Sequence, residues 1–187
     1  EAAVDMDDMS MIDRGIDVKN NRLYLLMVDT EKGDTEGDLV SVSLASKSLG
    51  AVEEHDSDVT SLEAVVDGTL YYTKDVNDRG VGDLYRDGEN VLSDVLQYSV
   101  EAIPDSSAVL CTTDPDRGSR IGTLTLLKKK GEGEELADGV YQFHAFDEKN
   151  IAILADYSEN RDRGDLLYYK GKEPYVIDTD VTMFFAH

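Results

Sequence analysis

The chain has 187 residues, a length typical of one domain or one array of repeats, since domains usually contain about 100–200 residues. Its 40 acidic and 18 basic residues give a net charge of −22, which argues against nucleic-acid binding and against docking on an acidic membrane surface. The single cysteine, Cys111, excludes an intrachain disulfide framework and a zinc site made of cysteines alone. No apolar run approaches the roughly 18–20 residues of a membrane-spanning helix, so we expect no membrane insertion by this segment.

One pattern occurs four times along the chain: an apolar run, an acidic loop that contains glycine, and a Gly-X-Leu sequence that opens a second apolar run. The copies cover residues 22–29 with 37–40, 69–75 with 82–85, 108–114 with 122–125, and 151–156 with 164–167. The leucines of the second run, Leu39, Leu84, Leu124 and Leu166, are 45, 40 and 42 residues apart. A fixed period of this length is the mark of a repeat architecture.

A second marker recurs between these copies, a short strand that ends in an acidic turn and an apolar residue. It occupies residues 51–59, 90–95, 135–140 and 175–181, and a looser copy at 3–9 opens the chain. Two independent markers with the same phase indicate a true repeat.

Each repeat therefore holds four short strands, which in the third repeat are predicted at 97–103, 108–113, 122–128 and 134–137. Tyr, Val, Leu and Thr dominate the runs, whereas Gly, Asn and Asp separate them, as strands and turns require. Four-stranded units with a period of about 40–45 residues are typical of a β-propeller. A β-sandwich is the alternative, and the one candidate helical turn, at residues 58–65, fits a strand at least as well.

The predicted fold class is all-β, a β-propeller segment of about four four-stranded antiparallel blades. Its blades are expected near residues 10–59, 60–95, 96–140 and 141–181, with partial strands at 1–9 and 182–187. An outer-type strand at 2–7 and an inner-type strand at 182–186 lack the two middle strands that would join them in one blade. We therefore expect an open arc from a ring of roughly six to eight blades. Such an arc would expose apolar residues at its ends, among them Leu23, Leu25, Phe184 and Phe185.

The second repeat reads Leu70-Tyr-Tyr-Thr-Lys-Asp75 followed by Gly82-Asp-Leu-Tyr-Arg-Asp-Gly88. It resembles the tyrosine-tryptophan-threonine-aspartate type of propeller repeat and the Tyr-Tyr repeats of uncharacterised bacterial propellers, including the TolB-like group. The resemblance implies an extracytoplasmic module for sensing or interaction, commonly placed behind a membrane anchor. The chain departs from the pattern because it has no Trp, and its third repeat has Val109-Leu-Cys111 where the tyrosines would stand.

The loops between the second and third strands of each repeat are the most distinctive polar feature. They cover residues 29–38, 75–83, 114–120 and 156–165, and together they hold fourteen acidic and six basic residues. In a propeller these loops lie on one rim, where negative potential would favour cations or a basic partner. The candidate contact residues are Asp29, Glu31, Asp34, Asp75, Asp78, Arg79, Asp114, Asp116, Arg117, Asp156, Asp162 and Arg163. The alternative is that these residues only form turns and keep the loops soluble.

Calcium is the one cofactor that the loops suggest. The loops beginning at Asp75 and Asp156 do not follow the EF-hand pattern of oxygen ligands. A different calcium geometry remains open in the first loop, at Asp29, Glu31, Asp34 and Glu36.

Catalytic signatures are missing from the sequence: it has no His-Glu-X-X-His, no Gly-X-Ser-X-Gly and no phosphate-binding glycine loop. The first interpretation is therefore a non-catalytic module that binds a protein, peptide or glycan, with the acidic loops as its contact face. The alternative is a carbohydrate-active propeller in which Glu63 and Glu101, on predicted inner strands, lie roughly 5–10 Å apart across a pocket. A purely structural spacer is the third possibility.

Overall fold

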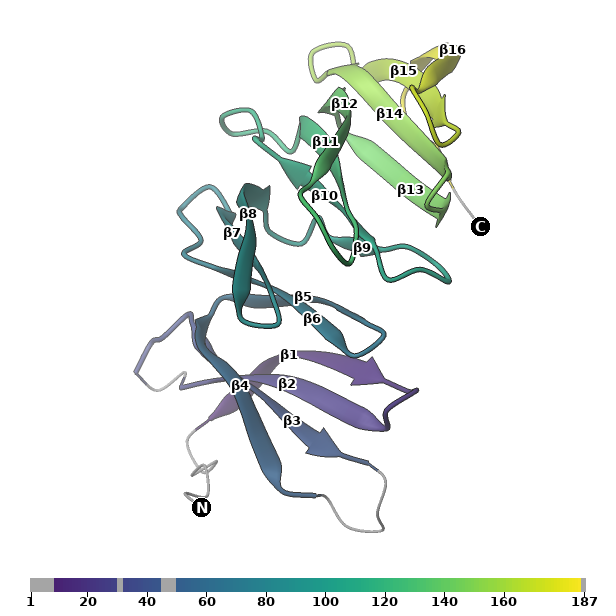
Figure 1. Cartoon of the computed structure of the whole chain (residues 1–187). Coiled ribbons are helices and arrows are strands. Elements are labelled where there is room, and N and C mark those ends of the chain that lie inside the picture. Colours follow the sequence, from purple (N-terminus) through teal and green to yellow (C-terminus); the bar gives the residue numbers. More distant parts are fainter. Residues whose placement is uncertain (1–8, 30–31, 45–49, 186–187) are drawn as a thin grey trace.

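A computed structural model describes residues 9–29, 32–44 and 50–185, and these residues form β-strands and turns without any helix. Figure 1 shows the strands in chain order. They are β1 (Ser10–Asp17), β2 (Arg22–Val28), β3 (Gly37–Ser43), β4 (Val52–Val59), β5 (Ser61–Val66), β6 (Thr69–Lys74), β7 (Val81–Arg86), β8 (Glu89–Leu96), β9 (Glu101–Ala102), β10 (Val109–Thr113), β11 (Gly122–Leu127), β12 (Glu134–Val140), β13 (Gln142–Asp147), β14 (Asn150–Ser158), β15 (Arg163–Tyr169) and β16 (Tyr175–Val181). The predicted all-β class is confirmed, and the helical turn considered at residues 58–65 is instead the end of β4 and the start of β5.

The strands pair as antiparallel neighbours in chain order, in sets of four. One sheet contains β1 to β4 and another contains β13 to β16. The strands between them form a single larger sheet, but β8 and β10 meet through only one residue pair, Val95 with Thr113. The result is a propeller-like arrangement in which the sets follow one another along an open arc, with the first and last sets at opposite ends (Figure 1).

The apolar core lies between successive sets of strands. Leu39 and Val59 of the first set pack with Leu62 and Tyr72 of the second. The next two boundaries are built in the same way, with Leu84 and Val95 at one, and Leu124 and Val140 at the other. In the first three sets, the leucine of Gly-X-Leu and the valine that ends the second marker therefore pack against the following set. Their burial stabilises the boundaries between sets.

The glycine of each Gly-X-Leu marker is required by close contact between strands. The glycines Gly37, Gly82, Gly122 and Gly164 pair with Val59, Val95, Val140 and Val181, respectively. A Cβ atom added to any of them would lie 2.1–2.6 Å from a backbone carbonyl oxygen of the preceding strand. No side chain fits there, which explains why the glycine recurs at each period.

The acidic turn at the end of the second sequence marker forms a β-bulge. The residue before each of these valines has a left-handed backbone: φ is 55° at Asp58, 55° at Asp94, 61° at Gly139 and 58° at Asp180. In all four sets, the third strand has two steps from the glycine to the leucine of the Gly-X-Leu marker. The fourth strand has three steps between the residues that pair with them, so it carries one extra residue there. Aspartate and glycine tolerate this conformation, whereas bulkier residues rarely adopt it.

Two strand predictions are wrong. The strand predicted at 97–103 is reduced to Glu101–Ala102, because residues 96–99 form a turn in which the Ser99 amide donates to the Leu96 carbonyl at 3.2 Å. Tyr98, within this turn, has a left-handed φ of 60°. The inner-type strand predicted at 182–186 is not a strand over residues 182–185, and the strand predicted at 2–7 lies outside the described residues.

Of the four apolar side chains predicted to be exposed at the ends of the arc, one is exposed. Phe185 is 78% exposed, whereas Leu23, Leu25 and Phe184 are half-buried. The last strand, β16, also exposes three consecutive apolar residues, Tyr175–Ile177. In the described part of the chain no segment has the form of a helix that could cross a membrane.

Candidate functional site

The four acidic loops emerge from the same edge of the arc. Figure 1 shows the β2–β3, β6–β7, β10–β11 and β14–β15 connections along its upper left side. We call this surface the loop rim; it comprises the described residues of 29–38, 75–83, 114–120 and 156–165. In an antiparallel set of four strands, the connection from the second to the third strand always leaves at the same end. The repeat therefore brings together on one surface loops that are far apart in sequence.

Left-handed aspartates start three of these loops. Asp75 and Asp114 follow directly on β6 and β10, whereas Asp156 lies in the last part of β14; their φ values are 56°, 48° and 49°. Their side chains are exposed. The first loop differs, because the Asp29 carboxylate accepts from the Lys32 amide at 3.2 Å and pairs with the Lys32 ammonium at 2.5 Å.

The Asp-Arg-Gly sequences have two different roles. In the copies at 78–80 and 116–118 the glycine supplies the left-handed residue of a tight turn, with φ of 72° at Gly80 and 78° at Gly118. In the third copy, at 162–164, the left-handed residue is instead Asp162, with φ of 54°, and Gly164 is the glycine of the Gly-X-Leu marker. The exposed side chains that these turns present are Asp78, Arg79, Asp116, Arg117, Asp162 and Arg163.

Neighbouring loops of the rim contact one another. The Ser119 hydroxyl of the third loop donates to the Glu159 carboxylate of the fourth at 3.0 Å. The second and third loops flank a hollow of about 420 Å³, lined by Arg79, Arg120 and Tyr98 among others. Within the fourth loop the Tyr157 hydroxyl donates to Asp162, and this hydrogen bond raises the pKa of Tyr157 to about 12.

The first loop gathers the acidic residues considered for calcium. Asp29, Asp34 and Glu36 line a hollow of about 450 Å³ together with Lys32, while Glu31 lies outside the described residues. Among the residues that the structure describes, no three His, Cys, Asp or Glu side chains come close enough to hold a metal ion. Calcium binding in this loop stays a prediction.

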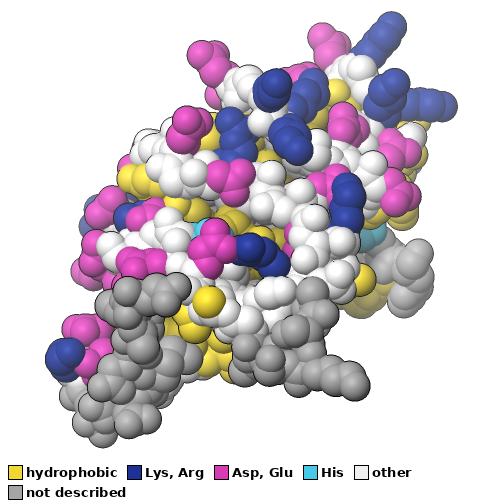
Figure 2. Space-filling model, turned by 60° about the horizontal axis from the view of Figure 1, so that its bottom comes forward, with side chains coloured by type: hydrophobic (Ala, Val, Ile, Leu, Met, Phe, Trp, Pro, Cys, Tyr) yellow, Lys and Arg dark blue, Asp and Glu magenta, His cyan; other side chains and the backbone are white. Residues whose placement is uncertain are grey.

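A second view of the surface shows where basic side chains gather. Figure 2 shows the face reached by turning the bottom of Figure 1 forward, and Lys and Arg side chains gather in its upper part with acidic side chains among them. Among the ion pairs of the described residues, Lys128 pairs with Glu134 at 2.8 Å, and both side chains are about half exposed. Such a base neutralises a nearby acid, whereas the loop rim, made of the described loop residues, has an excess of seven acidic residues.

Glu63 is a partly buried carboxyl group that accepts several hydrogen bonds. It lies on β5, and its Oε1 atom accepts from the Ser61 hydroxyl at 2.6 Å, the Tyr98 amide at 3.0 Å and the Thr73 hydroxyl at 3.4 Å. Its Oε2 atom is buried and has no hydrogen-bond partner. Burial raises the pKa of Glu63, and the hydrogen bonds from Ser61 and Tyr98 only partly oppose that effect.

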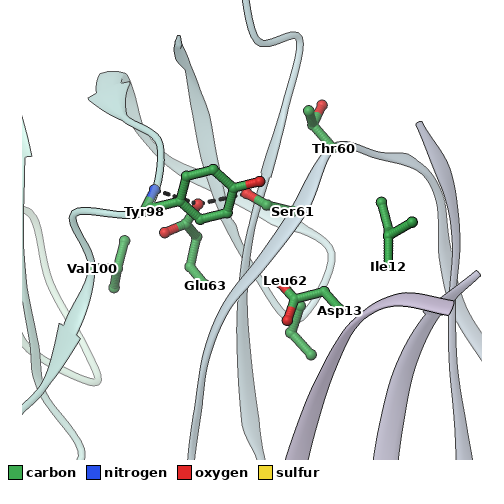
Figure 3. A pocket seen from close by; sticks show the side chains of 8 residues that line it. All are labelled: Ile12, Asp13, Thr60, Ser61, Leu62, Glu63, Tyr98 and Val100. Carbon is green, nitrogen blue, oxygen red and sulfur yellow. Dashed lines mark hydrogen bonds between the residues drawn. The ribbon is translucent and has the colours of Figure 1, made fainter. Parts of the chain in front are cut away.

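Glu63 lines a hollow of about 390 Å³, which we call the Glu63 hollow (Figure 3). Its other lining residues are Ile12 and Asp13 from β1, Thr60 to Leu62 at the start of β5, and Tyr98 and Val100 from the segment before β9. Three successive sets of strands therefore contribute to it. Sequence reasoning selected Glu63 but missed its partner Tyr98, because residues 97–103 had been interpreted as a strand.

Glu101 has a different role from Glu63. It lies on β9, where its Oε1 atom accepts from the Ala145 amide at 3.0 Å and is 3.1 Å from Nδ1 of His144. It lines another hollow, of about 490 Å³, with Tyr141 and Phe143 among its walls. Each carboxylate thus accepts a hydrogen bond from a backbone amide beyond its own strand. The two hollows share Tyr98 and Val100, and a separation of roughly 5–10 Å between Glu63 and Glu101 stays a prediction.

Comparisons with known proteins add nothing to this geometry: no family model, no curated protein and no solved structure matches the chain.

Proposed function

We propose that the chain is a non-catalytic binding module of the β-propeller kind, and that the loop rim is its contact face for a basic protein or peptide. The observation that carries this proposal is the position of four acidic loops on one edge of the arc (Figure 1). By sequence these loops hold fourteen acidic and six basic residues. Pooling such an excess on one surface attracts cations over a distance of about one Debye length, roughly 8–10 Å at moderate salt.

The chemistry of the rim favours association through charge. Asp78 and Asp116 are exposed at the tips of neighbouring turns, and Asp34 is exposed in the first loop. Exposed carboxylates of this kind mainly increase association rates and set specificity. The binding of a basic partner should therefore weaken steeply as the salt concentration rises.

The test compares two triple variants that raise the net charge by the same amount. The rim variant carries Asp34→Asn, Asp78→Asn and Asp116→Asn, and asparagine preserves the turn-forming character of aspartate. The control carries Glu89→Gln, Glu132→Gln and Glu173→Gln, three exposed residues at turns between the third and fourth strands, on the other edge. Binding of a decalysine peptide to each protein is measured by calorimetry at low and moderate salt.

We expect the rim variant to bind decalysine at least about threefold more weakly, since each lost pairing with an exposed charge costs roughly 0.2–1 kcal/mol. The control should bind like the unmodified protein. Equal weakening in both variants would mean that only net charge matters and would overturn the rim assignment. Absence of binding in all three proteins would overturn the basic-partner proposal and favour a structural spacer.

A further inference from the structure

The repeat departs from its pattern at one of the links between sets of strands. A single residue, Thr60, joins β4 to β5, and a single residue, Tyr141, joins β12 to β13. By contrast, the four residues 97–100 join β8 to β9, and the strand that they lead into is only two residues long. Residues added to one copy of a repeat form loops, often on the binding face of the protein. The link at 97–100 is therefore a candidate for a function that the repeat itself does not require.

This link presents the Tyr98 ring to solvent. Tyr98 is 68% exposed and has a left-handed φ of 60°, which is an unfavourable backbone conformation for a residue with a bulky side chain. Hydrogen bonds nevertheless hold the link in place, because the Gln97 amide donates to the Gly80 carbonyl at 2.8 Å. The Glu63 carboxylate accepts from the amides of Tyr98, at 3.0 Å, and Val100 (Figure 3). Strained backbone that the surrounding structure fixes in this way occurs frequently at ligand-binding positions.

Besides the Glu63 hollow, Tyr98 lines two hollows that share part of their walls. One, of about 420 Å³, lies between the second and third loops of the rim. The other, of about 490 Å³, extends to the link between the third and fourth sets of strands. Leu96, Tyr98 and Arg120 line both, so the two hollows are neighbours. We call these two hollows together the Tyr98 cleft.

A second aromatic ring lies in the wall of the larger hollow. Tyr141 lines this hollow and is 42% exposed. Its ring stacks on the Tyr157 ring, with 4.0 Å between the ring centroids and 9° between the planes. The Tyr157 hydroxyl in turn donates to Asp162. Both exposed tyrosines of the cleft are therefore held in place before a ligand arrives, and rigid aromatic side chains bind at a low cost in conformational entropy.

The cleft also offers hydrogen-bond donors and acceptors. Arg79 and Arg120 contribute guanidinium groups, and neither forms an ion pair with an acidic residue in the part of the chain that the structure describes. Gln97 adds an amide and Asp78 a carboxylate. Aromatic walls with a few polar groups suit a ligand that is apolar on one face and polar at its edge, which is the character of a sugar ring. The net charge of −22 would repel an acidic sugar and so favours a neutral one.

We propose that the Tyr98 cleft binds a neutral oligosaccharide, with sugar rings stacked on Tyr98 and Tyr141 and with sugar hydroxyls bonded to Arg79 and Arg120. The neighbouring hollows give room for more than one sugar unit. The inference goes beyond the proposed function and does not depend on it, because a neutral ligand is not attracted by the negative potential of the loop rim.

The test measures the binding of cellohexaose, maltohexaose, mannohexaose and chitohexaose by calorimetry and by NMR shifts of the Ser99 and Arg120 amides. Hexagalacturonate is the acidic comparison, and decaproline is the peptide comparison. Tyr98→Ala removes one aromatic ring, and Tyr175→Ala is its matched control, because Tyr175 is 50% exposed and lines neither hollow of the cleft. Arg120→Gln removes one guanidinium group, and its control is Arg14→Gln, at an exposed arginine of β1 outside the cleft.

At least one of the four neutral oligosaccharides should bind with a Kd below about 1 mM and shift the Ser99 and Arg120 amides. Tyr98→Ala should weaken its binding at least about tenfold and Arg120→Gln at least about fivefold, because the first loses ring contact and the second loses charged donors. The two controls should bind it like the unmodified protein. Tyr98→Asn keeps the test valid if Tyr98→Ala does not fold, since asparagine adopts a left-handed backbone more readily.

The other outcomes would overturn the proposal. They are the absence of binding by all four neutral oligosaccharides, and equal losses in Tyr98→Ala and Tyr175→Ala. Tighter binding of hexagalacturonate would indicate an anion site instead, and binding of decaproline alone would indicate a peptide groove. Tyr98→Ala should leave the binding of decalysine unchanged, so this inference and the proposed function can fail separately.

Discussion

The replacement Gly82→Ala tests whether the repeat glycines are required by strand contact. A Cβ atom at residue 82 would lie 2.5 Å from the carbonyl oxygen of Lys74 and 2.7 Å from Cγ2 of Val76. Ordinary contact begins near 3.4 Å, so β6 and β7 would have to separate by roughly 1 Å at this end. The obstacle is backbone, which cannot turn aside as a flexible side chain can.

The cost follows from that separation. Overpacking of this kind costs about 1–3 kcal/mol, and weakening the adjacent hydrogen bonds between the strands adds about 1 kcal/mol. We therefore expect Gly82→Ala to lower the free energy of unfolding by about 3 kcal/mol. The control is Gly80→Ala: no atom lies within 4 Å of the added Cβ, but φ is 72°. That backbone conformation alone costs an alanine about 1–2 kcal/mol.

Urea denaturation followed by circular dichroism measures the difference. With a slope of about 2 kcal/mol per molar urea, the midpoint should fall by about 1.5 M for Gly82→Ala and by clearly less for Gly80→Ala. Equal midpoints for the two variants would refute the contact argument, because the left-handed conformation would then account for the entire effect.

Three further predictions concern buried groups. Burial raises the pKa of Glu63, so ionisation of this carboxyl group destabilises the folded state as pH rises above 4.5. We therefore expect Glu63→Gln to stabilise the protein by about 1 kcal/mol at pH 7 and to have no such effect near pH 4. Urea titrations at the two pH values measure the difference. Asp56 is partly buried, which by itself raises its pKa, but hydrogen bonds from Tyr72 at 2.5 Å and Lys74 at 3.1 Å outweigh this and lower it. Tyr72→Phe should therefore cost about 1–3 kcal/mol at pH 7, and the difference from the unmodified protein should shrink as pH falls below 3.8; a constant difference in urea titrations would contradict this role. Burial raises the pKa of Cys111 to about 12, so its thiol should react with a disulfide reagent only as fast as the protein unfolds, and rapid labelling of the folded protein would contradict this.

The repeat could be predicted from sequence because its constraints are local and strict. Gly82 and its counterparts lie against a carbonyl oxygen, and Asp94 and its counterparts lie in a left-handed bulge. Few residue types satisfy either condition, so the same residue types recur at these positions in each repeat. The all-β class and the four-stranded antiparallel pattern follow from these positions together with the apolar runs.

The Glu63 hollow could not be predicted in the same way. Its geometry depends on Tyr98, which lies 35 residues further along the chain in a left-handed turn. The local sequence Gln-Tyr-Ser-Val around Tyr98 has the composition of a strand, but hydrogen bonds to Leu96, Gly80 and Glu63 hold these residues in a turn. Strand propensity predicted the wrong local structure for residues 97–100, because contacts with residues distant in sequence determine it.

The boundaries between sets of strands connect the fold to its candidate sites. At the first boundary the Asp56 carboxylate accepts from Tyr72, at the second Glu63 accepts from the Tyr98 amide, and at the third Glu101 accepts from the Ala145 amide. Each acidic group therefore helps to hold one set against the next. Of these three carboxylates, Glu63 is the one with a buried oxygen that has no hydrogen-bond donor, so the second boundary contains an unsatisfied polar atom.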